Sequence, residues 1–133
     1  YEARLRAQNL GPAWDSTTRQ RAHLILNDLQ QPASQLASCP AMPPLDTWPQ
    51  LLGAMYVLEG STLGGQVIAR QLAKANIPQR LYFSGYGERT GTMWKAFCQL
   101  LTQAATPENE ADIVQSARLT FQQLDAWLNQ PPA

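Results

Sequence analysis

The sequence predicts an all-α fold in which four to five helices surround one hydrophobic core. Apolar residues recur at helical spacing in several segments, whereas β-branched residues are few and no stretch alternates cleanly over five residues. Capping residues and prolines mark the ends of the helical segments. The 133 residues are enough for one domain and too few for two, so we expect a single domain over residues 1–133.

The first two helices are expected in the N-terminal part of the chain. One pattern begins at Tyr1 and fades at Gly11-Pro12, and the other runs from Thr17 to Gln31 with Asp15-Ser16 as its cap. The second pattern has an apolar face made of Ala22, Ile25, Leu26 and Leu29. No Ser, Thr, Asp or Asn precedes the first pattern, and no methionine opens the chain. We therefore expect an N-terminally incomplete domain.

A proline-rich connector and a long helix come next. Residues 32–46 contain four of the ten prolines, which predicts an extended connector. We expect it to be ordered against the core by three apolar side chains, those of Leu36, Met42 and Leu45. A capping-box pattern at Thr47–Gln50 predicts that a long helix follows over residues 48–76. Asn76 and the proline two residues later are expected to end it.

Two further helices are expected in the C-terminal part. Residues 78–90 are rich in glycine and tyrosine and predict a loop, after which a fourth helix spans residues 91–105. Thr106-Pro107 is expected to cap a fifth helix that runs to Asn129. The apolar face of this last helix is predicted to consist of Ile113, Ala117, Phe121, Leu124 and Leu128.

Composition excludes several classes of protein. Ten basic residues balance ten acidic ones, and a net charge of zero argues against a nucleic-acid-binding protein. The apolar run around Met55–Leu58 is far too short to span a membrane, and no signal peptide opens the chain. Cys39 and Cys98 lie far apart without CxxC spacing, so we expect neither a disulfide framework nor a zinc site. A cytoplasmic location is therefore expected.

Four glycines lie inside the predicted long helix, and each lowers its helix propensity by about 0.8–1 kcal/mol relative to alanine. At 100° per residue, Gly60 and Gly64 lie within about 20° of Gly53, and Gly65 lies about 120° away. Such a stripe either seats a neighbouring helix or brings a flat ligand against the backbone. A phosphate-binding loop is excluded because no strand precedes the glycines and no Gly-Lys-Ser/Thr occurs.

Residues 56–65 read Tyr-Val-Leu-Glu-Gly-Ser-Thr-Leu-Gly-Gly. Together with the later aromatic spacing, this segment resembles the bacterial heme oxygenases, most closely those associated with bacteriophytochromes. The aromatic residues concerned are Phe83, Tyr86, Trp94, Phe97, Phe121 and Trp127. The resemblance implies a heme-oxygenase-like helical bundle, here without its first helix, in which the glycine-rich helix lies over the distal face of heme.

The resemblance also implies a function. Heme is expected to serve as substrate and cofactor, and O2-dependent cleavage to yield biliverdin, carbon monoxide and iron. The biliverdin would supply a bacteriophytochrome, or the reaction would serve to release iron. Electrons would come from a separate ferredoxin or reductase, and no nucleic acid or membrane is expected as a partner. The alternative is a non-catalytic heme-oxygenase-like domain with a binding or structural role.

Site residues follow by the same resemblance. Gly60, Ser61 and Gly64 are expected at the catalytic position, with Ser61 where animal-type enzymes have an aspartate. Heme contacts are expected from Tyr56, Gly60, Gly64, Gly65 and Lys95. The family's iron ligand is a histidine on the first helix, which is absent here. The single histidine, His23, matches the following helix, so no metal ligand is assigned to this chain.

Two expectations concern the remaining side chains of this region. Glu59 and Gln66 fall on the side of the long helix opposite the stripe, which predicts a solvated or helix-pairing face rather than a carboxylate pair. Four aromatic residues are expected in the core by default, namely Trp94, Phe97, Phe121 and Trp127.

Overall fold

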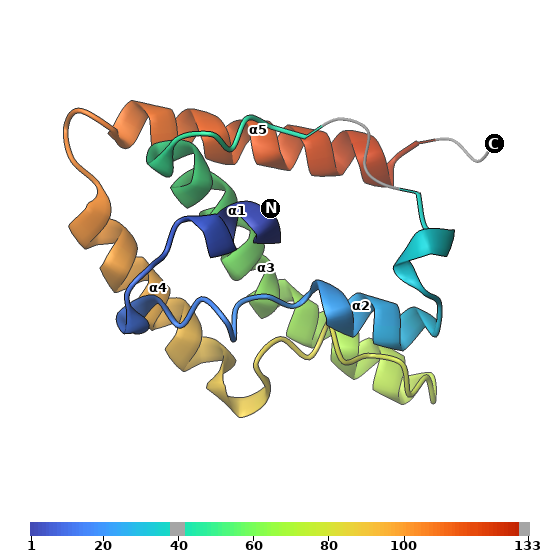
Figure 1. Ribbon diagram of the computed structural model, residues 1–133. Helices are drawn as coiled ribbons and strands as arrows, with labels where there is room; N and C mark the ends of the chain where they lie inside the picture. The colour runs from blue at the N-terminus through green and yellow to red at the C-terminus, as the bar shows by residue number, and fades with distance from the viewer. Residues whose placement is uncertain (38–41, 131–133) are drawn as a thin grey trace.

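A computed structural model describes residues 1–37 and 42–130, and this part of the chain is helical without a strand, which confirms the predicted all-α class (Figure 1). Its five α-helices are α1 (Glu2–Ala7), α2 (Ala22–Leu29), α3 (Trp48–Lys74), α4 (Thr90–Ala104) and α5 (Glu110–Leu128). Three short 3-10 helices cover Pro12–Trp14, Ala33–Gln35 and Gly87–Arg89. Across residues 1–37 and 42–130, no helix combines the length and apolarity that crossing a membrane requires.

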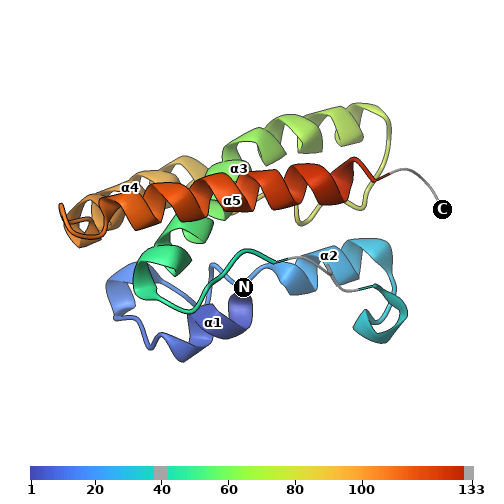
Figure 2. The same cartoon turned by 90° about the horizontal axis from the view of Figure 1, so that it is seen from above.

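Helix α3 is the central element, and α4 and α5 pack along it (Figures 1 and 2). Helix α5 runs parallel to α3. The hydroxyl of Ser116, in the first half of α5, donates a hydrogen bond to the Gln50 carbonyl of α3. Helix α4 runs antiparallel to α3, and the Gln66 amide donates to the Thr90 hydroxyl at 2.9 Å. The N-terminal segment with α1 and α2 lies away from α4 and α5, below them in Figure 2.

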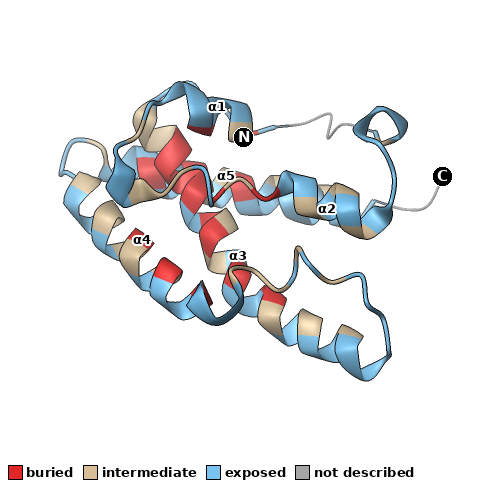
Figure 3. Cartoon of the chain, turned by 60° about the horizontal axis from the view of Figure 1, so that its bottom comes forward, coloured by how far each residue is buried: buried red, intermediate tan, exposed pale blue. Residues whose placement is uncertain are grey.

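The core is concentrated on the first half of α3, where the buried positions in Figure 3 cluster. Leu51 and Met55 of α3 pack with Leu5 of α1 and Phe97 of α4, and all four side chains are fully buried or nearly so. Trp14 closes this cluster from the side, with its ring edge-to-face with that of Trp48. The burial of Leu5 among these side chains holds the short helix α1 against α3.

The ends of α3 confirm the capping pattern. The Thr47 hydroxyl accepts a hydrogen bond from the Gln50 backbone N–H, and the Gln50 side chain accepts from the Thr47 N–H in return. At the other end Asn76 adopts a left-handed conformation with φ 60°, which stops the helix. Helix α5 is preceded by a similar reciprocal pair between Thr106 and Asn109, so the predicted cap closes the turn just before the helix.

The predicted start of the second helix at Thr17 is wrong, because α2 begins at Ala22. Asp15 has a positive φ of 50° and accepts a hydrogen bond from the Thr18 hydroxyl, which closes a turn in place of a helix cap. The N-terminus of α2 is instead capped from α1. The carboxylate of Glu2 accepts hydrogen bonds from the backbone N–H groups of Arg21 and Ala22 at 2.7 and 2.8 Å.

The predicted apolar face of α5 is wrong at three positions, and the predicted contacts of the connector are wrong at Met42, whereas Leu36 and Leu45 are half-buried. The side of α5 that contacts α3 carries Ile113, Ser116 and Thr120, whereas three residues of the predicted face, Phe121, Leu124 and Leu128, are exposed. Small polar side chains fit here because α5 lies so close to α3. In the connector, Pro43 is buried and Met42 is exposed, while Cys39 and Pro40 lie outside the described residues.

Candidate functional site

A groove of about 390 Å³ opens where α3, α4 and α5 meet. Helix α3 contributes most of its lining, α4 contributes Trp94, and α5 contributes Phe121 and Leu124. The lining residues from α3 are Tyr56, Val57, Gly60, Ser61, Leu63 and Gly64. The groove is therefore mainly apolar, with two glycines and one serine on its central helix. This composition suits a flat apolar ligand that needs few polar contacts.

The four glycines of α3 have different neighbours. A β-carbon at Gly53 would lie 2.7 Å from the Ala117 backbone nitrogen of α5, and one at Gly65 would lie 2.8 Å from the Phe83 carbonyl oxygen. Both glycines are thus required by close backbone packing. A β-carbon at Gly64 would meet nothing within 4 Å. The glycines of the predicted stripe therefore have different roles. Gly53 allows α5 to pack closely, whereas Gly64 faces an open groove.

Trp94 forms the α4 wall of the groove. A β-carbon at Gly60 would stand 3.3 Å from the edge of the Trp94 ring, which is a tight contact. The same indole lies 5.7 Å from the Tyr56 ring and stacks on Phe97 at 5.9 Å between centroids. Trp94 thus connects the groove to the core, while Tyr56, with 40% of its surface exposed, stands at the groove's mouth.

Ser61 and Tyr56 carry the two hydroxyls of the lining. The hydroxyl of Ser61 donates a hydrogen bond to the Leu58 carbonyl oxygen at 2.6 Å within α3. Its proton is therefore engaged, and its oxygen lone pairs are available to accept from a ligand or a water molecule. A neutral hydroxyl adds no charge to the groove.

The structure brings Tyr56, Gly60, Ser61 and Gly64 together in one groove, and it does not bring Gly65 or Lys95 into it. Gly65 faces the loop at Phe83, and the Lys95 side chain is exposed on α4 outside the lining. Among the predicted core aromatics, Phe97 is fully buried, whereas Phe121 is 55% exposed and lines the groove, so its core assignment is wrong.

The only side chain of the lining that could ligate iron is the phenol of Tyr56. None of the nine lining residues carries an imidazole, a thiol or a thioether. His23 is exposed on α2 and lines a different, shallow pocket, and Cys98 is a half-buried free thiol on α4. In the part of the chain that the structure describes, no three His, Cys, Asp or Glu side chains gather to hold a metal ion.

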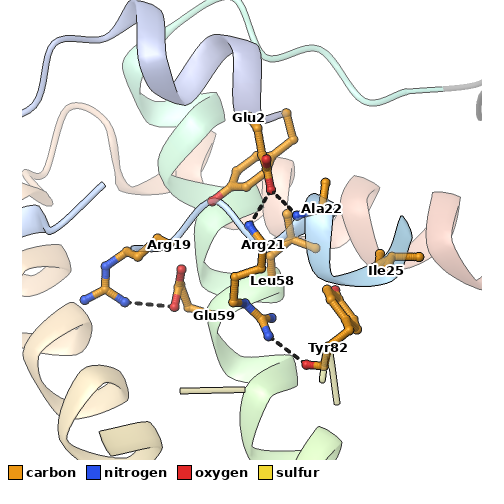
Figure 4. A pocket seen from close by; sticks show the side chains of 9 residues that line it. Glu2, Arg19, Arg21, Ala22, Ile25, Leu58, Glu59 and Tyr82 are labelled. Carbon is orange, nitrogen blue, oxygen red and sulfur yellow. Dashed lines mark hydrogen bonds and ion pairs between the residues drawn. The ribbon is translucent and has the colours of Figure 1, made fainter. Parts of the chain in front are cut away.

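Sequence reasoning missed a buried cluster on the opposite side of α3, made of Arg19, Glu59 and Tyr86. The Arg19 guanidinium and the Glu59 carboxylate form an ion pair at 2.8 Å, with both side chains almost completely buried (Figure 4). The Tyr86 hydroxyl donates to the same carboxylate, at 2.7 and 2.9 Å from its two oxygens. Of the two alternatives predicted for this side of α3, a solvated or a helix-pairing face, the solvated one is therefore wrong at Glu59.

The surroundings of this cluster are aromatic. The Arg21 guanidinium lies 4.6 Å from the centroid of the Tyr82 ring and donates to the Tyr82 carbonyl (Figure 4). Burial, and then the nearby Glu59 carboxylate, raise the pKa of the Tyr86 phenol above its ordinary value. A cavity of about 280 Å³ lies beside the cluster and is lined in part by Tyr1, whose buried hydroxyl has no hydrogen-bond partner among residues 1–37 and 42–130.

One signal in the sequence points to this cluster. Glu59 is the only charged residue between Asp46 and Arg70, in a stretch that is otherwise apolar or neutral. A lone charge in such a stretch indicates a buried position with a partner, since an unpaired charge is costly to bury. The partner itself does not follow from the pattern, because Arg19 is 40 residues away in the chain.

The chain is similar to one known protein family and to one curated protein. The heme oxygenase family profile matches residues 8–130. A heme oxygenase of Xanthomonas campestris pv. campestris (strain 8004) is 30% identical over 118 residues, which cover 84% of this chain and 68% of that protein. No solved structure matches.

Proposed function

Because the chain belongs to the heme oxygenase family, we propose that it binds heme in the groove between α3, α4 and α5. We propose further that the complete protein catalyses the O2-dependent cleavage of heme to biliverdin, carbon monoxide and iron. Bound heme is the substrate and also the group at which dioxygen is activated. The chain's own residues have the task of holding the ring and controlling access to it.

Gly64 is the observation that supports this site most directly. A glycine inside a helix costs about 0.8–1 kcal/mol of helix propensity relative to alanine. At Gly53 and Gly65 close backbone packing explains that cost, but at Gly64 nothing lies within 4 Å of a β-carbon position. A flat ligand that lies against the backbone at Gly64 would account for the missing side chain.

The other lining residues fit a porphyrin ring. Trp94, Phe121 and Leu124 offer apolar and aromatic surface on two sides of the glycine helix. The Ser61 oxygen can accept a hydrogen bond from a water molecule beside the ligand. The lining holds no imidazole, thiol or thioether, and its one phenol, that of Tyr56, stands at the groove's mouth. We therefore propose that none of these nine residues is the iron ligand.

The partners of the reaction belong to the proposal as well. Heme cleavage consumes electrons, and we propose that a separate ferredoxin or reductase supplies them. We also propose that the biliverdin passes to a bacteriophytochrome, as the resemblance of residues 56–65 implies. The lack of an imidazole, thiol or thioether in the lining favours one alternative, a domain that binds heme without cleaving it.

A pair of glycine variants tests the site. Gly64→Leu places a side chain in the groove, whereas Gly91→Leu makes the same change at a helical glycine of α4 that also has nothing within 4 Å. We expect Gly64→Leu to weaken hemin binding at least tenfold in an absorbance titration, and Gly91→Leu to leave it unchanged. Equal hemin affinity of the two variants would reject the groove as the heme site.

A turnover assay separates the enzyme from the binding domain. The chain is loaded with hemin in the presence of free imidazole, which can occupy an iron coordination position, and is then given ascorbate and O2. We expect biliverdin, identified by its absorption spectrum, from the wild type and from Gly91→Leu but not from Gly64→Leu. Hemin binding without biliverdin under these conditions would favour the non-catalytic alternative for this chain.

A further inference from the structure

Glu59 and Gly60 are neighbours in α3 that face different sides of the helix. Gly60 lines the groove, and Glu59 is 97% buried in the cluster with Arg19 and Tyr86, since only 3% of its surface is exposed. Successive helical residues differ by about 100°, so the rotation of α3 that buries Glu59 also sets the direction in which Gly60 points. The two sides of the helix are therefore coupled by geometry.

Arg19 connects this point of α3 with α4. Besides its ion pair with Glu59, its guanidinium donates to the Met93 carbonyl of α4 at 3.3 Å, and its Nε donates to the Trp14 carbonyl at 2.7 Å. The residue after Met93 is Trp94, whose ring contacts Gly60. One guanidinium thus holds the residue that precedes Gly60 and the residue that precedes Trp94.

A second contact reinforces this connection. The Arg19 guanidinium carbon lies 5.8 Å from the centroid of the Phe97 ring, and Phe97 stacks on Trp94. Phe97 is fully buried, so it transmits the position of Arg19 to Trp94 through close packing. The path from the ion pair to the groove contains only direct contacts between buried or half-buried residues.

Stability alone does not explain why this ion pair is buried. Removing two charges from water is costly, and apolar side chains of similar volume often replace a buried ion pair at no loss of stability. What an apolar pair cannot reproduce is the set of directed hydrogen bonds that Arg19 makes to three different segments. A geometric role is therefore more consistent with these contacts than a stabilising one.

We propose that Arg19 and Glu59 are positioning residues of the groove: their ion pair, closed by the Tyr86 hydroxyl, holds Trp94 against Gly60. The inference rests on the proposed function only where it concerns heme. Trp94 defines one wall of the groove, so a displaced indole changes the shape that a ring-shaped ligand meets. Neither Arg19 nor Glu59 touches the groove itself.

The test replaces both charges by apolar side chains of similar size, in the double variant Arg19→Met, Glu59→Leu. Its first readout is the NMR signal of the Gly60 α-protons in the heme-free protein, which the ring current of Trp94 displaces. The displacement is the difference in the Gly60 α-proton chemical shift between the wild type and Trp94→Leu. The second readout is the hemin dissociation constant. The matched control, Arg4→Met, Asp46→Leu, replaces an arginine and a carboxylate by the same two apolar side chains at an exposed ion pair of 2.9 Å.

We expect the double variant to stay folded, to lose the Gly60 ring-current displacement, and to bind hemin about tenfold more weakly, because a displaced indole changes the shape of one groove wall. The control should keep both values. A folded double variant that keeps the displacement and the hemin affinity would overturn the positioning role.

Two outcomes need a further measurement: a double variant that does not fold, and a wild type that does not bind hemin. If the double variant does not fold, Glu59→Gln and Tyr86→Phe take its place, since each removes one charge or one hydroxyl, and retention of the Gly60 displacement in both would overturn the proposal. If the wild type does not bind hemin, the proposed function fails. The NMR readout in the heme-free protein still decides whether the cluster positions Trp94.

Discussion

The indole of Trp94 and the backbone of Gly60 are in such close contact that a β-carbon at residue 60 would stand 3.3 Å from the ring. This contact joins α3 and α4 at the centre of the groove. Its tightness means that the ring's position and the absence of a side chain at Gly60 depend on each other. At Gly64, one turn further along α3, no such neighbour is present within 4 Å.

Gly60→Ala should therefore displace the indole by a few tenths of an ångström. The helix gains about 0.8–1 kcal/mol from the exchange, and the strain against Trp94 offsets most of that gain. We expect the free energy of unfolding of the heme-free protein to change by less than about 1 kcal/mol in urea titrations. The near-UV circular dichroism of the indoles should change. A full gain in stability with an unchanged near-UV spectrum would contradict the tight contact.

Alanine at Gly53 and at Gly64 should have opposite effects on the heme-free protein. At Gly53 the new methyl group overlaps the backbone of α5, and we expect a loss of about 1–3 kcal/mol or more. At Gly64 the space is open, and we expect a gain of about 0.8–1 kcal/mol from helix propensity. Urea unfolding of the two variants measures both values, and a stabilised Gly53→Ala would show that α5 does not lie against this glycine.

Local signals explain which parts of the fold the sequence predicts. The capping box of Thr47 and Gln50 involves residues three apart, and the left-handed stop at Asn76 involves one residue, so both ends of α3 can be predicted from the pattern. The start of α2 cannot, because its cap is the carboxylate of Glu2, 20 residues before Ala22. A cap supplied by another helix leaves no mark beside the helix that it caps.

In the candidate site, too, some features can be predicted from the sequence and others cannot. Periodicity correctly places Gly53, Gly60 and Gly64 on one side of α3, but it does not show that α5 covers only the first of them closely. The role of Arg19 is harder to predict, since two of its three hydrogen-bond partners are 40 and 74 residues away in the chain. Its burial depends on three segments meeting, which helical periodicity does not describe.

The Glu2 cap gives a prediction of its own. Glu2→Ala removes the acceptor of two backbone N–H groups at the start of α2, and we expect it to lower the free energy of unfolding by about 1–2 kcal/mol. Hydrogen exchange at Arg21 and Ala22 should become faster than in the wild type. The control is Glu108→Ala at an exposed position, which should leave the exchange at α2 unchanged. Equal exchange in both variants would contradict the cap.

Alkaline pH should destabilise the protein through Tyr86. Burial, and then the Glu59 carboxylate, raise the pKa of this phenol in the folded state above the value of about 10 that it has in the unfolded chain. Above pH 10 the unfolded chain therefore binds fewer protons than the folded one, so the free energy of unfolding falls as the pH rises. The loss is at most about 1.4 kcal/mol per pH unit, and less because solvent reaches part of the Tyr86 side chain.

Tyr86→Phe separates this effect from ordinary loss of a hydrogen bond. At pH 8 the variant lacks a donor to a charged acceptor, and we expect it to be less stable than the wild type by about 1.5–3 kcal/mol. At pH 11 the difference should shrink, because the wild type has begun to lose the stability that the protonated phenol provides. Burial also raises the pKa of Tyr1, so the variant keeps part of the alkaline slope, and Tyr1→Phe should remove that part. Urea unfolding at the two pH values measures the difference, and a constant gap between wild type and Tyr86→Phe would refute the role of the Tyr86 proton.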